Sequence, residues 1–521
     1  MERQGRIAQA AGAMSLATFL SRILGLVRDM TLASFFGAAG TSDTFFVAFR
    51  IPNLLRELFA EGSMSSAFVP VLTQVRARDG EEAAARLVRV TFTFMLLLVG
   101  AFCALGVIFA PQIVLAIAPG FRGDPEKMAL TVLLARIMFP FLLFVSLAAL
   151  VMGALNTRRV FFVPALAPAV LNIVWIASVP LLTGRISPAV AAVAMGVAIG
   201  GFAQFAFQVP SFLRAGFSLA PAGGFGHPGL RRMGVLILPA TVGLAVAQVN
   251  IFVSNILASY LPQGSITCLY YSMRLIQFPV GIFGVAMGMA VLPALSEHAA
   301  RGQMDHLRED FSYALRLLFF ITVPAMAGLI ALRGPIVNLL FVRGRFDAAA
   351  AAGTAEALLY YALGVWAMVG VRVVTATFYS LQETRMPVRV GVGAMVVNLA
   401  LSVALMGPMA HAGLALANAC ASMANFTALF LLLRRRLGRL ETSRIARSLL
   451  RAVAAATLMG LAGWALLRGP LWEAGGHTAL KAGLFAGVSA LCVGVYLGTS
   501  RLLGSEEFGA VLALARRRAG R

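Results

Sequence analysis

The sequence predicts an all-α polytopic membrane protein, and three observations lead to this class. Of its 521 residues, 60% are hydrophobic and only 12% are charged, well below the roughly 25% charged residues of soluble domains. The mean hydropathy is +0.87. Apolar runs of about 20 residues recur throughout the chain, each long enough to cross a hydrocarbon core of roughly 30 Å as a helix. We therefore expect about 14 transmembrane helices.

The expected helices follow the apolar runs in order. They lie at about residues 8–34, 43–72, 88–112, 128–155, 161–182, 187–212, 232–260, 266–296, 310–332, 350–380, 387–407, 410–433, 448–467 and 479–500. The first run follows two arginines, as in a signal peptide. However, Arg22 and Arg28 interrupt it and no clear small-residue cleavage site closes it, so we interpret it as a retained first helix.

The basic residues lie mainly in alternate loops. A net charge of +22 could indicate nucleic-acid binding, so the distribution of the charge is decisive. If the N-terminus is cytoplasmic, most loop arginines face the cytoplasm, including the run 434–451 and the tail 516–521. The positive-inside rule then places both termini in the cytoplasm and explains the charge without nucleic acid. Attraction of anionic lipid headgroups is an alternative for the run 434–451.

Motifs for enzymatic chemistry are missing from the sequence. Cys103, Cys268, Cys420 and Cys492 stand singly, which predicts neither a disulfide framework nor a metal site. No phosphate-binding G-x-x-x-x-G-K-[ST] loop is present, and the five histidines are scattered. We therefore expect no enzyme activity, no metal and no cofactor.

A weak internal repeat is also visible. Leu155 and Asn172 match Leu381 and Asn398 at one offset of 226 (381 − 155), and the segment from Ala67 resembles that from Ala290 at 223 (290 − 67). Two ordered matches favour duplication of a six-helix unit. The expected organisation is an N-lobe at 1–215, a C-lobe at 230–435 and two additional helices at 445–503. Such lobes share one orientation, with the substrate path between them.

Four arginines fall well inside expected spans, where each costs about 2.5–3.5 kcal/mol on insertion scales. They are Arg22, Arg28, Arg56 and Arg274. One interpretation is that they only form ion pairs or extend to the membrane surface. Intramembrane arginines more often face a water-filled cavity, and guanidinium groups bind phosphate oxygens in a bidentate way. An anionic, phosphorylated substrate follows as a hypothesis.

Three acids accompany these arginines: Asp29, Asp43 and Glu61. They are either ion-pair partners or groups that titrate during transport, and we favour partners. Other arginines nearer the span ends are interpreted as side chains that extend to the interface; these are Arg50, Arg136, Arg316 and Arg372.

Glycines and prolines inside the spans predict bends. Gly25 lies between Arg22 and Arg28, and the cluster Pro279, Gly281 and Gly284 follows Arg274. This cluster is the best candidate for a hinge, while close helix packing is the alternative for any single glycine.

Several segments resemble the MurJ (MviN) family of lipid II flippases over about the first 415 residues. They are Ser21-Arg22-Ile-Leu-Gly25-Leu-Val-Arg28-Asp29, Phe36-Gly37-Ala, Asp43-Thr-Phe-Phe-Val-Ala-Phe-Arg50-Ile-Pro52-Asn53-Leu-Leu-Arg56, Phe59-Ala-Glu61-Gly62, Ala118-Pro-Gly-Phe121, Leu155-Asn156-Thr157, Tyr270-Tyr271 with Arg274, Phe278-Pro279, Phe378-Tyr379-Ser380 and His411-Ala-Gly413-Leu.

The resemblance implies the fold of the multidrug/oligosaccharidyl-lipid/polysaccharide exporter superfamily and a place in the bacterial cytoplasmic membrane. It implies a substrate, undecaprenyl-pyrophosphate-linked muropeptide (lipid II), that crosses by alternating access. Arg22, Arg28, Arg56 and Arg274 occupy the positions of the family's cavity arginines, and helices 13 and 14 those of a lipid-tail groove. Implied partners are membrane lipids and proteins of cell-wall synthesis or division.

The sequence departs from the family pattern at several positions. Met273 stands where some relatives carry an acid, and Glu57 where some carry a second basic residue. Helices 7 and 11 lack the acids of a cation site and offer Gln248, Asn250, Asn255, Asn398 and Ser402. A coupling ion is therefore not identified, and coupling to the membrane potential is an alternative.

Other functions remain open at this point. An exporter of another polyprenyl-linked oligosaccharide or of drugs shares the fold, although a drug-cation exporter should carry acids in its cavity. A membrane enzyme acting on polyprenyl phosphates needs clustered acids or histidines, which the sequence lacks. A non-transporting scaffold for cell-wall synthases is the third alternative.

Overall fold

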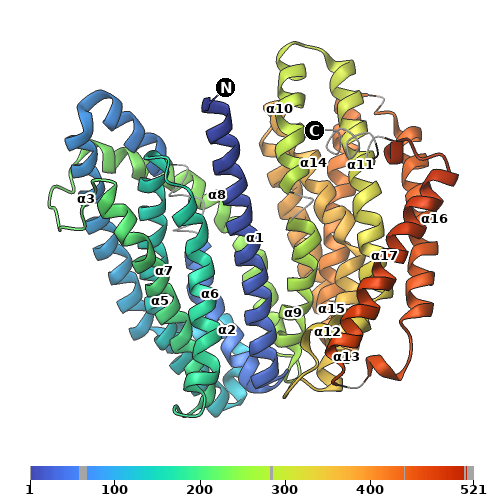
Figure 1. Cartoon of the computed structure of the whole chain (residues 1–521), viewed down its shortest axis with the longest axis horizontal. Coiled ribbons are helices and arrows are strands. Elements are labelled where there is room, and N and C mark those ends of the chain that lie inside the picture. Colours follow the sequence, from blue (N-terminus) through green and yellow to red (C-terminus); the bar gives the residue numbers. More distant parts are fainter. Residues whose placement is uncertain are drawn as a thin grey trace. The chain divides into compact units, whose positions relative to one another are not determined.

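Every element of the computed structural model, over the residues that it describes, is a helix (Figure 1). Those residues are 2–57, 67–281, 285–438, 440–473, 475–509 and 512, with side chains described outside 2–15, 238–247, 285–286 and 288–290. The elements are α1 Glu2–Phe36, α2 Gly40–Arg56, α3 Val69–Ile108, α4 Ala110–Ile117, η3 Pro119–Gly123, α5 Pro125–Thr157, α6 Phe162–Leu182, α7 Ala189–Arg214, α8 Pro228–Ser259, α9 Ser265–Pro279, α10 Val285–Ala300, α11 Met304–Ala331, α12 Arg333–Phe341, α13 Ala348–Leu363, α14 Val365–Ser380, α15 Arg385–Leu437, α16 Thr442–Leu466, η5 Pro470–Trp472 and α17 Thr478–Leu502.

The expected all-α membrane class is confirmed. Among the described residues, nine helical segments are long and apolar enough to cross a membrane, so the expected count of 14 stays a prediction. Two expected spans are interrupted in the structure. The span 266–296 divides into α9 and α10 after Pro279, and the span 350–380 divides into α13 and α14 at Gly364. The spans 387–407 and 410–433 are confirmed as two helices within α15, which meet at a sharp break at Ala410, where φ is 46°.

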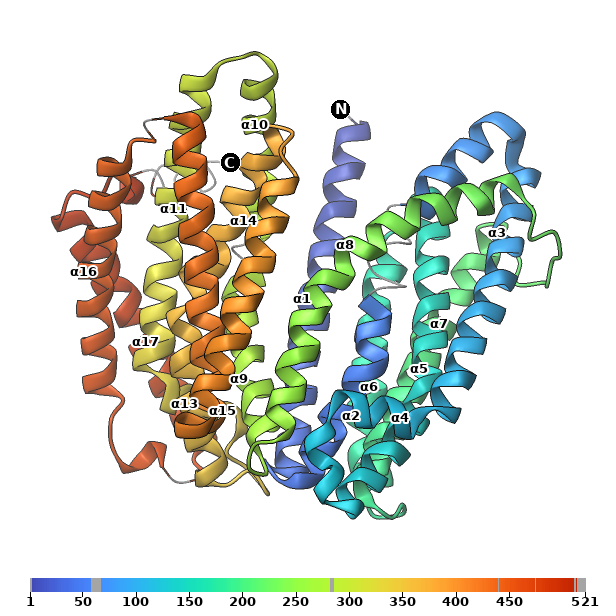
Figure 2. The ribbon, with the colours of Figure 1, turned by 180° about the vertical axis from the view of Figure 1, so that it is seen from behind.

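The chain divides into two compact units, Met1–Gly264 and Ser265–Arg521. In the first, α7 packs against α5 and α6, α1 against α6, and both α2 and α3 against α5. Its core contains Phe68, Leu142, Leu150 and Phe212, each completely buried. Helix α8 packs on α3, α4 and η3, and Figure 2 shows the beginning of α8 beside α3.

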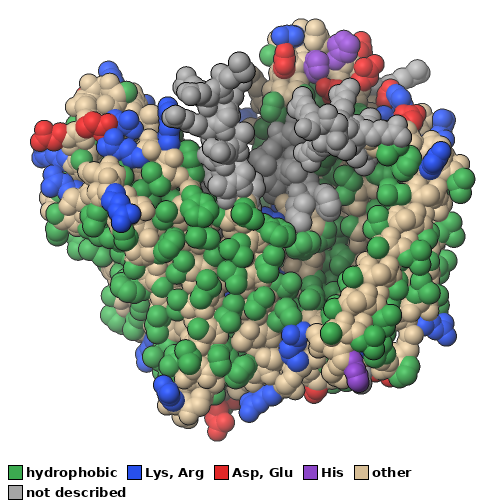
Figure 3. Space-filling model, in the orientation of Figure 1, with side chains coloured by type: hydrophobic (Ala, Val, Ile, Leu, Met, Phe, Trp, Pro, Cys, Tyr) green, Lys and Arg blue, Asp and Glu red, His purple; other side chains and the backbone are tan. Residues whose placement is uncertain are grey.

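In the second unit, α16 packs along α11, α15 along α14, and α9 against α13. Helix α17 packs against α16. Phe311, Leu315, Phe378 and Leu433 are almost completely buried in its core. On the face shown in Figure 3, hydrophobic side chains cover the middle of the helices and charged side chains gather near their ends, as expected of helices that cross a membrane.

The structure shows an internal repeat at an offset of 223 residues. Helix α5 spans 33 residues from Pro125 to Thr157, and α13 with α14 spans 33 residues from Ala348 to Ser380, so both ends differ by 223 (348 − 125 and 380 − 157). The residue before each start is an aspartate that caps the helix. Asp124 accepts from the N–H of Lys127, and Asp347 accepts from the N–H of Ala350.

The turns that end these helices repeat as well. Arg159 and Gln382 both have positive φ, 62° and 59°. The N–H of Val160 donates to Leu155, and that of Glu383 donates to Phe378, again 223 residues on. Leu155 therefore corresponds to Phe378 in this turn, and its expected match with Leu381 at an offset of 226 is wrong here. Phe378 and Leu381 are about one helical turn apart, so a displacement by one turn preserves the apolar pattern. The sequence similarity therefore does not fix the register of the repeat.

The same offset relates α8 to α1, because Ser259 ends 223 residues after Phe36. Helix α8 is therefore the first helix of the second copy by repeat, although it packs within the first unit. The lobe bounds expected from the sequence, which begin the second lobe at 230, stay a prediction.

Candidate functional site

Arg28 lies in a polar cage between α1 and α6. Its Nε and one terminal nitrogen donate to the same oxygen of Asp29, at 3.0 and 2.7 Å. Its other terminal nitrogen donates to Oδ1 of Asn172, at 3.2 Å. The amide nitrogen of Asn172 in turn donates to the carbonyl of Ser21. Since Arg28 is 8% exposed and Asp29 1% exposed, the two form a buried ion pair with a fixed orientation.

An aromatic ring closes the cage. The guanidinium carbon of Arg28 lies 4.2 Å from the centre of the Trp175 ring, a cation–π arrangement. Phe45 and Phe49 of α2 pack edge-on against the same indole. Three helices therefore fix the position of Arg28, because α1 carries it, α6 supplies Asn172 and Trp175, and α2 supports the indole.

Arg56 takes part in a separate network. Its Nε donates to Oδ1 of Asn53, at 3.2 Å, and the amide nitrogen of Asn53 donates to Glu57, at 3.1 Å. Gln248 of α8 donates to the other carboxylate oxygen of Glu57. The end of α2 is thereby linked to α8 through Glu57.

The remaining candidate arginines have different surroundings. Arg22 is exposed on α1 while Arg28 is buried, because residues six apart on a helix are offset by about 240° and do not share a face. Arg274 is half-buried on α9 and takes part in at least one interaction with a neighbour. Their assignment to a substrate site stays a prediction.

The three candidate acids also differ in their surroundings. Asp29 pairs with Arg28, as expected of an ion-pair partner. Asp43 lies in the first turn of α2, accepts from the N–H of Gly264 at 2.6 Å and lies 4.0 Å from Nζ of Lys127. Glu61 lies outside the described residues.

The candidate hinge residues are partly described. Gly25 is buried within α1, which continues as a helix on both sides. Pro279 ends α9, and Gly281 follows in a wider helical turn. Gly284 lies outside the described residues. The break between α9 and α10 lies where the proline and glycines predict it, and movement there stays a prediction.

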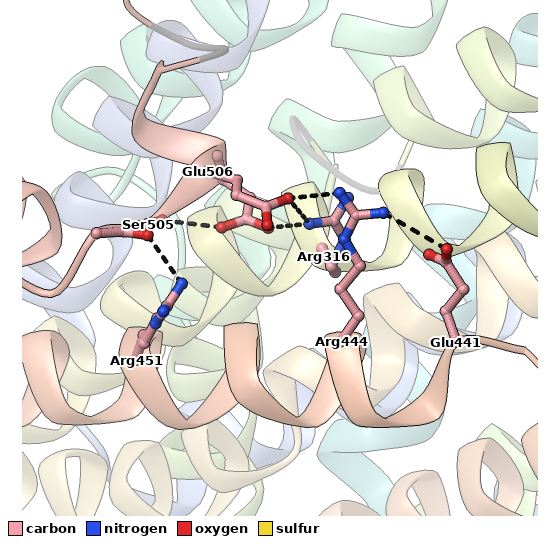
Figure 4. Close-up of polar contacts among 8 residues, drawn as sticks. Arg316, Glu441, Arg444, Arg451, Ser505 and Glu506 are labelled. Atoms are coloured by element: carbon pink, nitrogen blue, oxygen red, sulfur yellow. Dashed lines mark hydrogen bonds and ion pairs between the residues drawn. The ribbon is translucent and has the colours of Figure 1, made fainter.

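One interpretation of the sequence is wrong. Arg316 does not extend to the membrane surface: it is 5% exposed and pairs with Glu506 and Glu507 at 2.7 and 3.0 Å (Figure 4). Sequence reasoning also missed Lys481, which is 2% exposed and donates to Asn338 at 2.8 Å. The sequence did offer a signal for the partners of Arg316: Glu506 and Glu507 are adjacent acids in an otherwise basic segment after the last apolar run.

In the part of the chain that the structure describes, no three or more histidine, cysteine, aspartate or glutamate side chains gather in a way that could hold a metal ion. A caged arginine on α1, together with the nine segments among the described residues that are long and apolar enough to cross a membrane, defines a polytopic membrane protein with polar sites among its helices.

The comparisons with known proteins identify the family. The chain matches the family described as "Lipid II flippase MurJ" over residues 32–478, and it belongs to that family. A relative from Vibrio cholerae, named "Probable lipid II flippase MurJ", is 35% identical over 432 residues, 82% of each protein. A "Lipid II flippase MurJ" from Burkholderia cenocepacia is 34% identical over 423 residues, 80% of this chain and 82% of the relative.

Solved structures show the same fold. "Lipid II flippase MurJ, inward closed conformation" superposes with a TM-score of 0.74 at 24% identity, over 93% of this chain and 98% of that one. An inward-facing multidrug transporter of the MATE family and MOP superfamily gives a TM-score of 0.66 at 15% identity, over 81% and 96%. The expected family and fold are confirmed, and the chain is a multi-pass protein of the bacterial inner membrane.

Proposed function

We propose that this protein flips lipid II from the inner to the outer leaflet of the cytoplasmic membrane. The observation that carries the proposal is the family match over residues 32–478, together with relatives of that name at 34–35% identity over most of both chains. The role is that of a transporter without enzymatic activity.

Arg28, Arg56 and Arg274, with Arg22, are the proposed ligands of the substrate pyrophosphate. Support comes from the surroundings of Arg28, whose guanidinium binds a carboxylate through two of its nitrogens. A phosphate oxygen is also anionic and can accept hydrogen bonds from the same two nitrogens. In this proposal the pyrophosphate takes the place of the Asp29 carboxylate on Arg28, so that the guanidinium of Arg28 keeps an anionic partner.

The proposed cycle is alternating access with both termini in the cytoplasm. The lobes open inward, the pyrophosphate binds the arginines, and the polyprenyl chain remains in lipid. A membrane potential is worth about 2.3 kcal/mol per charge per 100 mV, and a negative interior favours outward movement of an anion. No cofactor is needed, and the potential or an unidentified ion supplies the coupling.

The test is complementation in cells depleted of their own lipid II flippase, with the accessibility of lipid II at the outer leaflet as the readout. The wild-type protein should restore accessibility, whereas Arg28→Ala and Arg274→Ala should not. Arg136→Ala is the matched control, because Arg136 is also an arginine on a spanning helix, is exposed and donates only to the Val107 carbonyl among the contacts described. If the protein is a non-transporting scaffold or an exporter of another glycan, expression of the wild-type protein will not restore the accessibility of lipid II at the outer leaflet.

A further inference from the structure

The segment that follows α17 is tied into the second unit by buried charges. Arg316 lies within α11, and one of its terminal nitrogens binds Oε2 of Glu506 at 2.7 Å and Oε1 of Glu507 at 3.0 Å. Glu507 is 3% exposed. Ser505 donates to the second oxygen of Glu507, at 2.8 Å. An arginine of a spanning helix is thus neutralised by residues about 190 positions later in the chain.

The same segment also binds the beginning of α16 (Figure 4). Arg444 donates to Oε2 of Glu506 at 2.9 Å and to Glu441 at 3.4 Å. Two turns further along α16, Arg451 donates to the carbonyl of Gly504 at 2.8 Å. Glu506 therefore bridges an arginine of α11 and an arginine of α16. We call Arg316, Arg444, Glu506 and Glu507 the carboxylate clamp.

Two further contacts hold α17 at other levels. The hydroxyl of Tyr496, in the second half of α17, donates to the carbonyl of Phe320 in α11 at 2.7 Å. At the opposite end of α17, Lys481 donates to Asn338 of α12. The amide nitrogen of Asn338 donates to the carbonyl of Trp472. Helix α17 is therefore attached to the rest of the unit near both ends and between them.

The seam between α11 and α16 is narrow. A Cβ atom placed on Gly460 of α16 would lie 3.6 Å from the Cβ of Ala331 and 3.9 Å from that of Ala327. Small residues at a helix interface allow the two backbones to approach closely. Close packing and the carboxylate clamp act on the same pair of helices.

We propose that Arg316 and Glu507 are positioning residues that keep α16 and α17 fixed on α11 throughout the transport cycle. The inference deepens the proposed function, on which its transport readout rests. Buried ion pairs with several hydrogen bonds are costly to separate, so the pair Arg316–Glu507 holds the segment after α17 on α11. Helix α16 is held to that segment by the contacts of Arg444 and Arg451 and to α11 by the close packing at Gly460. The movements of the cycle therefore occur elsewhere, and the α16–α17 pair travels with α11.

A disulfide across the seam tests this directly. The Cβ separation of 3.6 Å between positions 460 and 331 lies in the range of natural disulfides, about 3.5–4.5 Å. Gly460→Cys and Ala331→Cys are combined in a background in which the four native cysteines are replaced. Lipid II flipping is then measured in proteoliposomes before and after oxidation. Retained flipping in the oxidised protein supports the proposal, and a loss that reduction reverses overturns it.

A rescue experiment tests the role of the two charges. Arg316→Gln with Glu507→Gln removes both charges together, so that neither remains buried alone. This variant should lose flipping in the reduced state and regain it when the 460–331 disulfide is formed. Normal flipping by the reduced variant, or failure of the disulfide to restore it, contradicts the proposal. If the variant does not fold, the disulfide in the intact clamp still decides.

A distance measurement separates this inference from the proposed function. Spin labels at Leu450 of α16 and Tyr313 of α11, both exposed, report the helix separation without any transport. A single narrow distance distribution in the intact protein that broadens in Arg316→Gln/Glu507→Gln supports the clamp. A broad distribution in the intact protein overturns it. If the wild-type protein does not flip lipid II, the proposed function fails, while this measurement still tests the clamp.

Discussion

Arg28 and Asp29 are neighbours in the chain, and two nitrogens of the arginine donate to a single oxygen of the aspartate, at 3.0 and 2.7 Å. A pair of adjacent residues on a helix usually points in different directions. Here the carboxylate turns to the guanidinium, and Asn172 and Trp175 of α6 complete the cage. The pair is neutral as a whole, which is how a charged arginine is accommodated at this depth.

Asp29→Ala should destabilise the protein by about 3–5 kcal/mol, because it leaves the charge of Arg28 buried without its anionic partner. Arg28→Met combined with Asp29→Ala should recover most of this loss. Thermal unfolding in detergent gives the comparison. The double variant should nevertheless fail to flip lipid II, so a stable double variant with normal flipping would contradict the role proposed for Arg28.

Gly120→Ala should destabilise the junction of η3 and α8. A Cβ at this position would lie 2.3 Å from the carbonyl oxygen of Ser259 and 2.7 Å from the backbone nitrogen of Tyr260, and a backbone cannot move aside as a side chain can. We expect a cost of about 1–3 kcal/mol. Gly123→Ala, in the same short helix, is the control, because nothing lies within 4 Å of its added Cβ. Equal melting temperatures of the two variants would refute the packing described.

Glu507→Gln and Glu506→Gln should differ in their effects, although the two residues are adjacent and both bind Arg316. The Glu507 side chain is 3% exposed and that of Glu506 is 53% exposed. Loss of a buried partner should cost at least about 2 kcal/mol, whereas an exposed ion pair is worth under about 1 kcal/mol. Thermal unfolding of both variants measures the difference. A larger effect of Glu506→Gln would mean that the carboxylate clamp depends on the exposed pair.

Acid should weaken the carboxylate clamp at Glu506. The hydrogen bond from Arg316, followed by that from Arg444, lowers the pKa of the Glu506 carboxyl below its ordinary value. A carboxyl whose pKa is lower in the folded state contributes stability above its unfolded pKa of about 4.3, and this contribution is lost as pH falls through the folded pKa.

Melting temperatures of the wild type and Glu506→Gln, measured from neutral pH to about pH 3, test this sign. The difference between the two proteins should be constant near neutral pH and should shrink as the carboxyl is protonated. Other carboxyl groups titrate in both proteins and cancel in the comparison. A difference that grows on acidification would contradict the lowered pKa.

Much of the fold could be predicted from the sequence, because apolar runs of this length have few alternatives to a membrane helix. The break after Pro279 was also predictable, since proline and glycine weaken the helical hydrogen bonds there. The register of the internal repeat could not be predicted from the sequence. The match of Leu155 with Leu381 is three residues from the structural one, Phe378, because similar apolar residues recur along a helix and one turn of displacement preserves the pattern.

The site was predictable to the extent that its residues are rare in membrane helices. Arg28 and Asp29 attract attention because a charge inside a span needs compensation. Asn172 was visible only as part of a repeat, with nothing to connect it to Arg28. The adjacent acids Glu506 and Glu507 were visible in the sequence, but their pairing with Arg316 was not, because they are about 190 residues away and only the packing of the second unit brings them together.

Flipping by the purified protein in lipid II-containing proteoliposomes tests the central claim most directly. The wild type and Arg136→Ala should move lipid II between leaflets, while Arg28→Ala and Arg274→Ala, at equal amounts of folded protein, should not. If the two alanine variants move lipid II at the wild-type rate, guanidinium groups do not bind the pyrophosphate, and the account of this site is wrong.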